Sequence, residues 1–171
     1  MELNLLALIL AAIAPMILGF IWYHDKVFGN AWLESIGMTK ETMNAGNMLK
    51  IFGGFFVCSI ILAFGLNIIA THDAFIAGAL YYETNGAMEP DPNSESGKWM
   101  QYYLDKLAAS NHTFQHVAFH GLLIGGIFIT VPIIISDALF EHKGWEYVAI
   151  KAGFWLISLA VMGGILASMS L

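Results

Sequence analysis

The chain of 171 residues is 58% hydrophobic and 12% charged, whereas about a quarter of the residues in an ordinary soluble domain are charged. Its formal net charge is -6, and none of its seven basic residues is an arginine, so it lacks the clustered basic side chains that bind nucleic-acid phosphates. These values predict a protein whose solvent is the lipid bilayer, and they exclude a nucleic-acid-binding protein.

Four long apolar runs predict four membrane-spanning helices, each long enough to cross a bilayer. The runs cover residues of about 3–23, 48–70, 116–140 and 146–169. Trp22 and Tyr23 end the first run with aromatic side chains, which are typical of the headgroup level. Pro132 lies inside the third run and predicts a kink that a transmembrane helix tolerates. We therefore expect an all-α fold, an integral membrane four-helix bundle forming one domain over residues 1–171.

The loop between the first two runs mixes charged, aromatic and glycine residues. Gly29 and Gly37 indicate turns, and Thr39 is a candidate N-cap for a short helix at the membrane interface.

A longer polar insert, residues of about 71–112, separates the second and third runs. Its centre, residues 85–97, contains Pro90 and Pro92 and predicts turns. Residues 98–110 place aromatic and leucine side chains at helical intervals, which predicts an amphipathic helix on the membrane surface. The insert is thus expected to be extramembrane, made of loops and short helices.

The lysines are distributed unevenly between the loops. Five of the seven belong to the first and third loops and the adjoining helix ends, whereas the insert is rich in aspartate and glutamate. Lysine favours the cytoplasmic side of a membrane. This bias predicts that both termini and the long acidic insert lie outside the cytoplasm.

Three histidines, His112, His116 and His120, follow one another at a spacing of four residues where the third run begins. Side chains at this spacing share one face of a helix. His72 ends the second run on the same side of the membrane and is a fourth candidate ligand. Imidazole nitrogens bind zinc, copper or haem iron. The alternative is that these histidines hydrogen-bond only to water or lipid headgroups.

Other polar residues lie near the ends of the apolar runs: Asp73, Asn67, Asp137 and His24. The first two are close in sequence to His72 and would extend the histidine site. Asp137 lies at the opposite side of the membrane and is expected to form an ion pair there, the alternative being a proton or cation site. Its candidate partners are His24, Lys26 and Lys151.

Gly121 and Gly125 form a GxxxG pair in the third run. Small residues at this spacing allow close contact between helices. The contact is either within one chain or between copies in a homo-oligomer.

Several short motifs together resemble a bacterial membrane family catalogued as domain of unknown function 1761. They are Gly19–Tyr23, Phe28-Gly29, Trp32, Gly37–Thr39, His120-Gly121, Gly125, Leu139–Glu141, Ala152–Trp155 and Gly163. The resemblance covers most of the chain outside residues of about 71–110. It implies a four-helix protein of the bacterial inner membrane in which Trp22, His120 and Phe140 are family positions, and it implies no activity.

The serines within the apolar runs form no recognisable nucleophile constellation, and neither a GxSxG motif nor a glycine-rich phosphate loop is present in the sequence. An enzyme is therefore not the favoured interpretation. We first expect a non-enzymatic subunit that associates with itself or with a larger membrane complex. The alternative is binding or permeation of a metal ion, proton or small solute through the histidine cluster. A metal-dependent or haem-linked enzyme is the third hypothesis.

Overall fold

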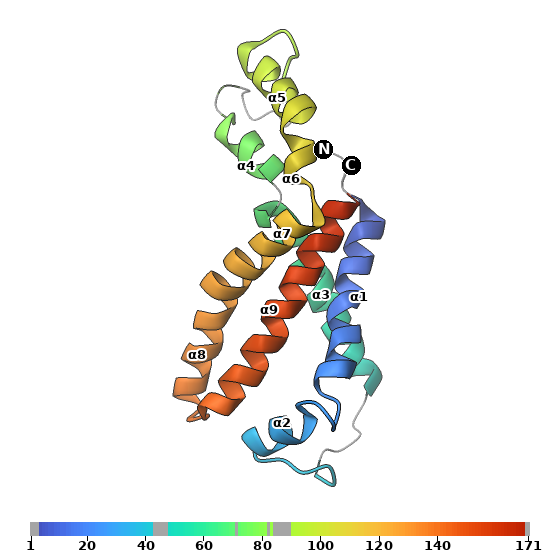
Figure 1. Ribbon diagram of the computed structural model, residues 1–171, viewed down its shortest axis with the longest axis vertical. Helices are drawn as coiled ribbons and strands as arrows, with labels where there is room; N and C mark the ends of the chain where they lie inside the picture. The colour runs from blue at the N-terminus through green and yellow to red at the C-terminus, as the bar shows by residue number, and fades with distance from the viewer. Residues whose placement is uncertain (1–3, 43–47, 71, 82, 84–89, 170–171) are drawn as a thin grey trace.

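The computed structural model describes residues 4–42, 48–70, 72–81, 83 and 90–169. Within them, four helices are long and apolar enough to cross a membrane: Leu5–Trp22, Leu49–Ile69, Phe114–Phe140 and Trp145–Ser168. These helices lie together along the lower part of Figure 1, and short helices lie at both ends. The predicted all-α fold with four membrane-spanning helices is confirmed.

The observed helix ends agree with the apolar runs to within two residues. Three spans are single helices: α1 (Leu5–Trp22), α3 (Met48–Ala70) and α9 (Trp145–Ser168). The third span has three segments: α7 (Phe114–His120), the π-helix η1 (Gly121–Thr130) and α8 (Val131–Phe140). The agreement follows from the bilayer, where a helix must satisfy its own backbone polar groups along the whole apolar run.

Helix α9 lies at the centre of the bundle. Of its apolar window 50% is buried, compared with 17% for α3, and α1, α3, α7 and η1 all pack against it. At Gly163, a Cβ atom would lie 2.6 Å from the carbonyl oxygen of Val117, and at Gly121 it would meet the carbonyl of Leu159. Such close backbone contact requires glycine. Gly121 of the GxxxG pair therefore packs helices within one chain.

A change of helix type precedes Pro132 in the third span. The N–H of Val131 donates to the carbonyl of Gly126, five residues earlier, and Pro132 occupies the first turn of α8. A proline in the first turn removes no hydrogen bond that the new helix needs. The disturbance predicted at Pro132 thus takes the form of a π-helical segment.

The first loop contains a helix that was not predicted. Helix α2 (Gly29–Ser35) begins at a glycine that was expected to form a turn, and Gly37 has a φ of 72°. Thr39 Oγ1 accepts the N–H of Thr42 at 3.3 Å, which is the hydrogen bond typical of an N-cap, and residues 40–42 form a turn. Residues 43–47, over which a helix capped by Thr39 would continue, lie outside the described residues.

The described part of the insert forms three short helices beyond the bundle (Figure 1). They are α4 (His72–Ala79), α5 (Glu95–Lys106) and α6 (Ala108–Asn111). Ser94 Oγ accepts the N–H of Gly97 at 3.0 Å and caps α5. One face of α5 packs against α4 through Met100, Tyr103 and Ala77. The range 98–110 predicted as one amphipathic helix is helical but divided at Leu107 into α5 and α6. Residues 85–89 of the predicted turns lie outside the described residues.

Candidate metal centre

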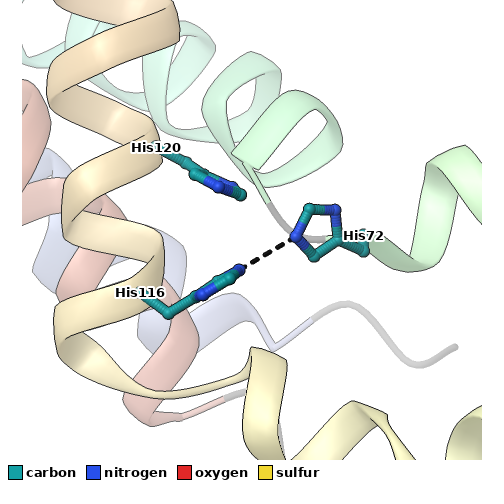
Figure 2. Close-up of side chains that lie close together, drawn as sticks. All are labelled: His72, His116 and His120. Atoms are coloured by element: carbon teal, nitrogen blue, oxygen red, sulfur yellow. Dashed lines mark hydrogen bonds between the residues drawn. The ribbon is translucent and has the colours of Figure 1, made fainter.

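Three histidine side chains converge where the insert meets the bundle (Figure 2). His116 and His120 project from α7, and His72 is the first residue of α4. The candidate ligand nitrogens of the three rings all lie within 4.8 Å of one another, and each side chain is half-buried. Two segments far apart in the sequence therefore contribute to a single cluster of imidazoles.

The packing of α7 on α9 determines the direction of His116 and His120. Val117 is fully buried and its backbone contacts the position of Gly163, while Gly121 contacts α9 one turn later. His116 and His120 each precede one of these residues, so they lie about 100° away around the helix. This rotation turns both imidazoles away from α9, and in Figure 2 both point towards His72.

The rings already contact one another closely. Nε2 of His72 lies 2.9 Å from Nε2 of His116 in a hydrogen bond. The ring of His120 lies 4.8 Å from that of His72 and 4.5 Å from that of His116, between centroids. One Nε2 in the hydrogen bond must donate and the other accept, so at least one of these rings presents a nitrogen lone pair.

This geometry fits a small transition-metal ion. Zinc binds imidazole at about 2.0–2.1 Å, so two nitrogens on a tetrahedral ion lie about 3.3 Å apart. The Nε2 atoms of His72 and His116 need to separate only slightly to reach that spacing, and the candidate ligand nitrogen of His120 lies within 4.8 Å of theirs. A porphyrin does not fit between rings that are directly hydrogen-bonded, so the donor set favours zinc or copper over haem.

Comparison with known proteins identifies the family of the chain. The family described as protein of unknown function (DUF1761) matches residues 6–167, which is nearly the whole chain. The chain belongs to this family. Neither the curated proteins nor the solved structures contained a match. The resemblance drawn from the sequence motifs is thus confirmed, and the site must be interpreted from its own chemistry.

His112 does not share the face of the other two histidines in this DUF1761 protein. Helix α6 ends before it, and Thr113 is extended, with a ψ of 148°. The helical phase is therefore interrupted between His112 and Phe114, and the buried His112 is not one of the three clustered rings. The prediction of a continuous ladder His112–His116–His120 was wrong for this reason.

The other polar candidates lie on both sides of the bundle. Asn67 is half-buried near the end of α3, and the side chain of Asp73 lies outside the described residues. His24 and Asp137 are exposed at the opposite end of the bundle. Among the described residues no ion pair joins Asp137 to His24, Lys26 or Lys151, so the expected pairing is not formed.

Thr113 positions the cluster, and this role was not predicted from the sequence. Its hydroxyl oxygen accepts the N–H of His116 at 3.3 Å and caps the first turn of α7. The available signal was a threonine immediately before an apolar run, which is typical of a helix start.

Proposed function

We propose that this membrane protein binds a divalent transition-metal ion, zinc or copper, through His72, His116 and His120. The observation that supports the proposal is the convergence of three imidazoles from α4 and α7, with their candidate ligand nitrogens within 4.8 Å of one another. Three neutral imidazoles are a common ligand set for zinc and leave one tetrahedral position for water or another ligand.

The core beside the cluster favours binding over passage through one chain. Leu66, Leu159 and Met162 pack in the centre of the bundle and are at most 2% exposed. The hydroxyls of Ser59 and Ser158 are also buried and have no hydrogen-bond partner in the described part of the chain. These closely packed and mainly apolar side chains do not form the row of polar ligands that a transmembrane ion path requires.

In this proposal the site faces the outside of a bacterial inner membrane. The support is the lysine bias of the two loops at the other end of the bundle and the bacterial family that the motifs resemble. Fusing alkaline phosphatase to the C-terminus tests the orientation, because this reporter is active only outside the cytoplasm. An inactive fusion that is produced at a normal level would reverse the assignment.

Isothermal titration of the chelator-treated, detergent-purified protein tests metal binding directly. We expect one Zn²⁺ or Cu²⁺ per chain, and at least about 100-fold weaker binding for His116→Ala or His120→Ala, since even second-shell changes cost 10- to 100-fold.

The matched control is His142→Asn, which removes an imidazole from the turn between α8 and α9. His142 has a φ of 53°, a backbone conformation that asparagine adopts readily. This variant should bind metal like the wild type. The proposal would be rejected if the wild type bound no metal, or if the control lost as much affinity as the cluster variants.

Association with a partner is a second candidate function, favoured by the outer face of α5. Trp99 and Tyr102 are 61% and 53% exposed there, and exposed aromatic side chains are enriched in protein interfaces. We expect Trp99→Ser/Tyr102→Ser to lower the molar mass measured by light scattering if the partner is a second copy. An unchanged monomeric mass in both proteins would exclude self-association through α5.

A further inference from the structure

A second concave site lies at the opposite end of the bundle from the histidine cluster. It is a cavity of about 750 Å³ lined by α1, α3, α9 and the start of the first loop. Its walls are largely aromatic and include Phe20, Phe52, Phe55, Phe154 and Trp155. The volume is within the range of about 300–1,000 Å³ that is usual for small-molecule sites.

The cavity borders the part of the protein surface that faces lipid. Phe20 of α1 and Ile51 of α3 line it and are 65% and 58% exposed, although both belong to membrane-spanning helices. In a bilayer, the molecules in contact with such side chains are lipids. An acyl chain therefore has direct access to the cavity.

Lys151 adds a positive charge to this apolar wall. Its side chain is half-buried on the second turn of α9, and its Nζ donates to the hydroxyl of Tyr147 at 2.7 Å. No carboxylate pairs with it in the described part of the chain. A charged side chain in a membrane span costs free energy unless an opposite charge or a polar headgroup lies next to it. An anion bound beside Lys151 would therefore be stabilising.

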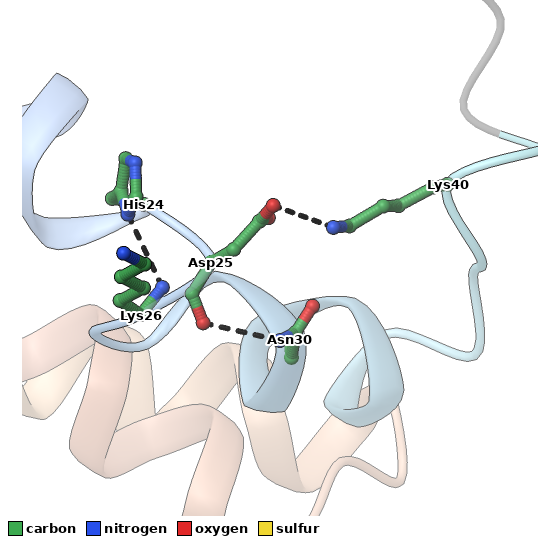
Figure 3. A network of polar contacts seen from close by, with 5 residues as sticks. All are labelled: His24, Asp25, Lys26, Asn30 and Lys40. Carbon is green, nitrogen blue, oxygen red and sulfur yellow. Dashed lines mark hydrogen bonds and ion pairs between the residues drawn. The ribbon is translucent and has the colours of Figure 1, made fainter.

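The acidic residue nearest the cavity does not supply that anion. Asp25 lines the cavity, but it pairs with Lys40 at 2.6 Å (Figure 3). This ion pair holds the pKa of Asp25 below its ordinary value, so the carboxylate stays ionised and is neutralised by Lys40. The neighbouring His24 accepts the N–H of Lys26 at Nδ1, at 3.2 Å, which leaves Nε2 as the hydrogen-bond donor of the neutral ring.

We propose that this cavity binds one anionic phospholipid from the adjacent leaflet, with an acyl chain among the aromatic side chains and the phosphate at Lys151. The location supports this occupant, because five of the seven lysines lie in the first and third loops, the first turn of α3 and the second turn of α9. Basic pockets between transmembrane helices on a lysine-rich side are typical sites for anionic headgroups. The site is separate from the metal centre and does not depend on it.

Native mass spectrometry of the delipidated full chain tests the proposal with two lipids of identical acyl chains, phosphatidylglycerol and phosphatidylcholine. The wild type should bind one phosphatidylglycerol molecule in preference to phosphatidylcholine. Lys151→Met should weaken phosphatidylglycerol binding about tenfold, the loss expected for one charge-assisted hydrogen bond, while Lys151→Arg should retain the preference.

Two further variants separate charge, volume and folding. Lys26→Met removes a lysine at the same end of the bundle that does not line the cavity, so it should bind like the wild type. Gly19 lines the cavity, so the side chain of Gly19→Leu should fill it and weaken the binding of both lipids. The variant should still fold, because a Cβ at this position makes only an ordinary contact with Phe154, at 3.8 Å.

Equal binding of the two lipids by the wild type would overturn the proposal, as would an unchanged preference in Lys151→Met. Preferential binding of oleate over phosphatidylglycerol would assign the cavity to a single-chain acid instead. Neither result would alter the metal titration, so the two proposals can fail independently.

Discussion

The two ends of the bundle differ in how closely their helices approach. At the histidine end, Gly121 and Gly163 allow α7–η1 and α9 to meet backbone against backbone. At the lysine end, the large rings of Tyr23, Phe154 and Trp155 lie between the helices and border an open cavity. At the histidine end, small residues allow the helices to pack closely and so fix the positions of polar side chains. At the lysine end, aromatic residues keep the helices apart and leave space for a ligand.

Among variants that test this difference between the two ends, Gly163→Ala is expected to change stability most. The new Cβ would lie 2.6 Å from the Val117 carbonyl, so α7 must move away from α9. Overpacking of this kind lowers the free energy of unfolding by about 1–3 kcal/mol. We expect the upper part of that range, because the new Cβ meets backbone atoms and not a flexible side chain. Unfolding by denaturant in detergent micelles measures the change.

Gly53→Ala is the matched control, since the same substitution in α3 meets nothing within 4 Å. It should be neutral or stabilise slightly, because alanine favours a helix by about 1 kcal/mol over glycine. Equal destabilisation by the two variants would contradict the close contact of α7 with α9.

At the other end, Trp22→Phe should have the next largest effect. Trp22 Nε1 donates to the carbonyl of Ile150 at 3.1 Å, and its ring packs on Gly153. We expect a loss of about 1–2 kcal/mol from the hydrogen bond and the smaller ring, measured by the same unfolding assay. Trp99→Phe replaces an exposed tryptophan and should change stability little. A loss of stability as large as that of Trp22→Phe would contradict a specific contribution from the Trp22–Ile150 hydrogen bond and the packing on Gly153.

Thr113→Ala should have a smaller effect that extends to the histidine cluster. It removes the N-cap that accepts the His116 N–H, which costs about 1 kcal/mol. Because the first turn of α7 positions His116, zinc affinity should fall severalfold in the same titration. Thr113→Ser keeps the capping oxygen and should retain both stability and zinc affinity. Equal losses of stability and zinc affinity in the serine and alanine variants would argue against capping by Thr113.

The smallest effect is expected at the exposed Asp25–Lys40 pair. The pKa of Asp25 is lower in the folded protein than the ordinary value of 3.8, so the pair stabilises the fold above about pH 4. This contribution is lost as the pH falls through the lowered pKa.

Lys40→Met should raise the pKa of Asp25 towards 3.8, which carboxyl ¹³C NMR can follow during a pH titration. Stability at neutral pH should hardly change, because both side chains are about half exposed. An Asp25 pKa that did not move would exclude the ion pair in solution.

The sequence by itself determined the helices that cross the membrane and the spacing of two of the clustered histidines. Apolar run length sets the ends of a transmembrane helix, because the backbone must satisfy its own hydrogen bonds wherever lipid surrounds it. The spacing of four residues between His116 and His120 places them on one face for an equally local reason. These features depend on neighbouring residues, so no contact between distant segments was needed to predict them.

Only the tertiary structure decided where those faces point and what meets them. The packing of Val117 and Gly121 on α9 sets the rotation of α7, and His72 joins from 44 residues earlier than His116. The interruption at Thr113 removes His112 from the cluster. Lys151 was considered in the sequence as a partner for Asp137 and as part of the lysine bias, yet it lines a cavity between three helices. Such arrangements depend on shape complementarity between segments distant in sequence, which the pattern of any one segment does not contain.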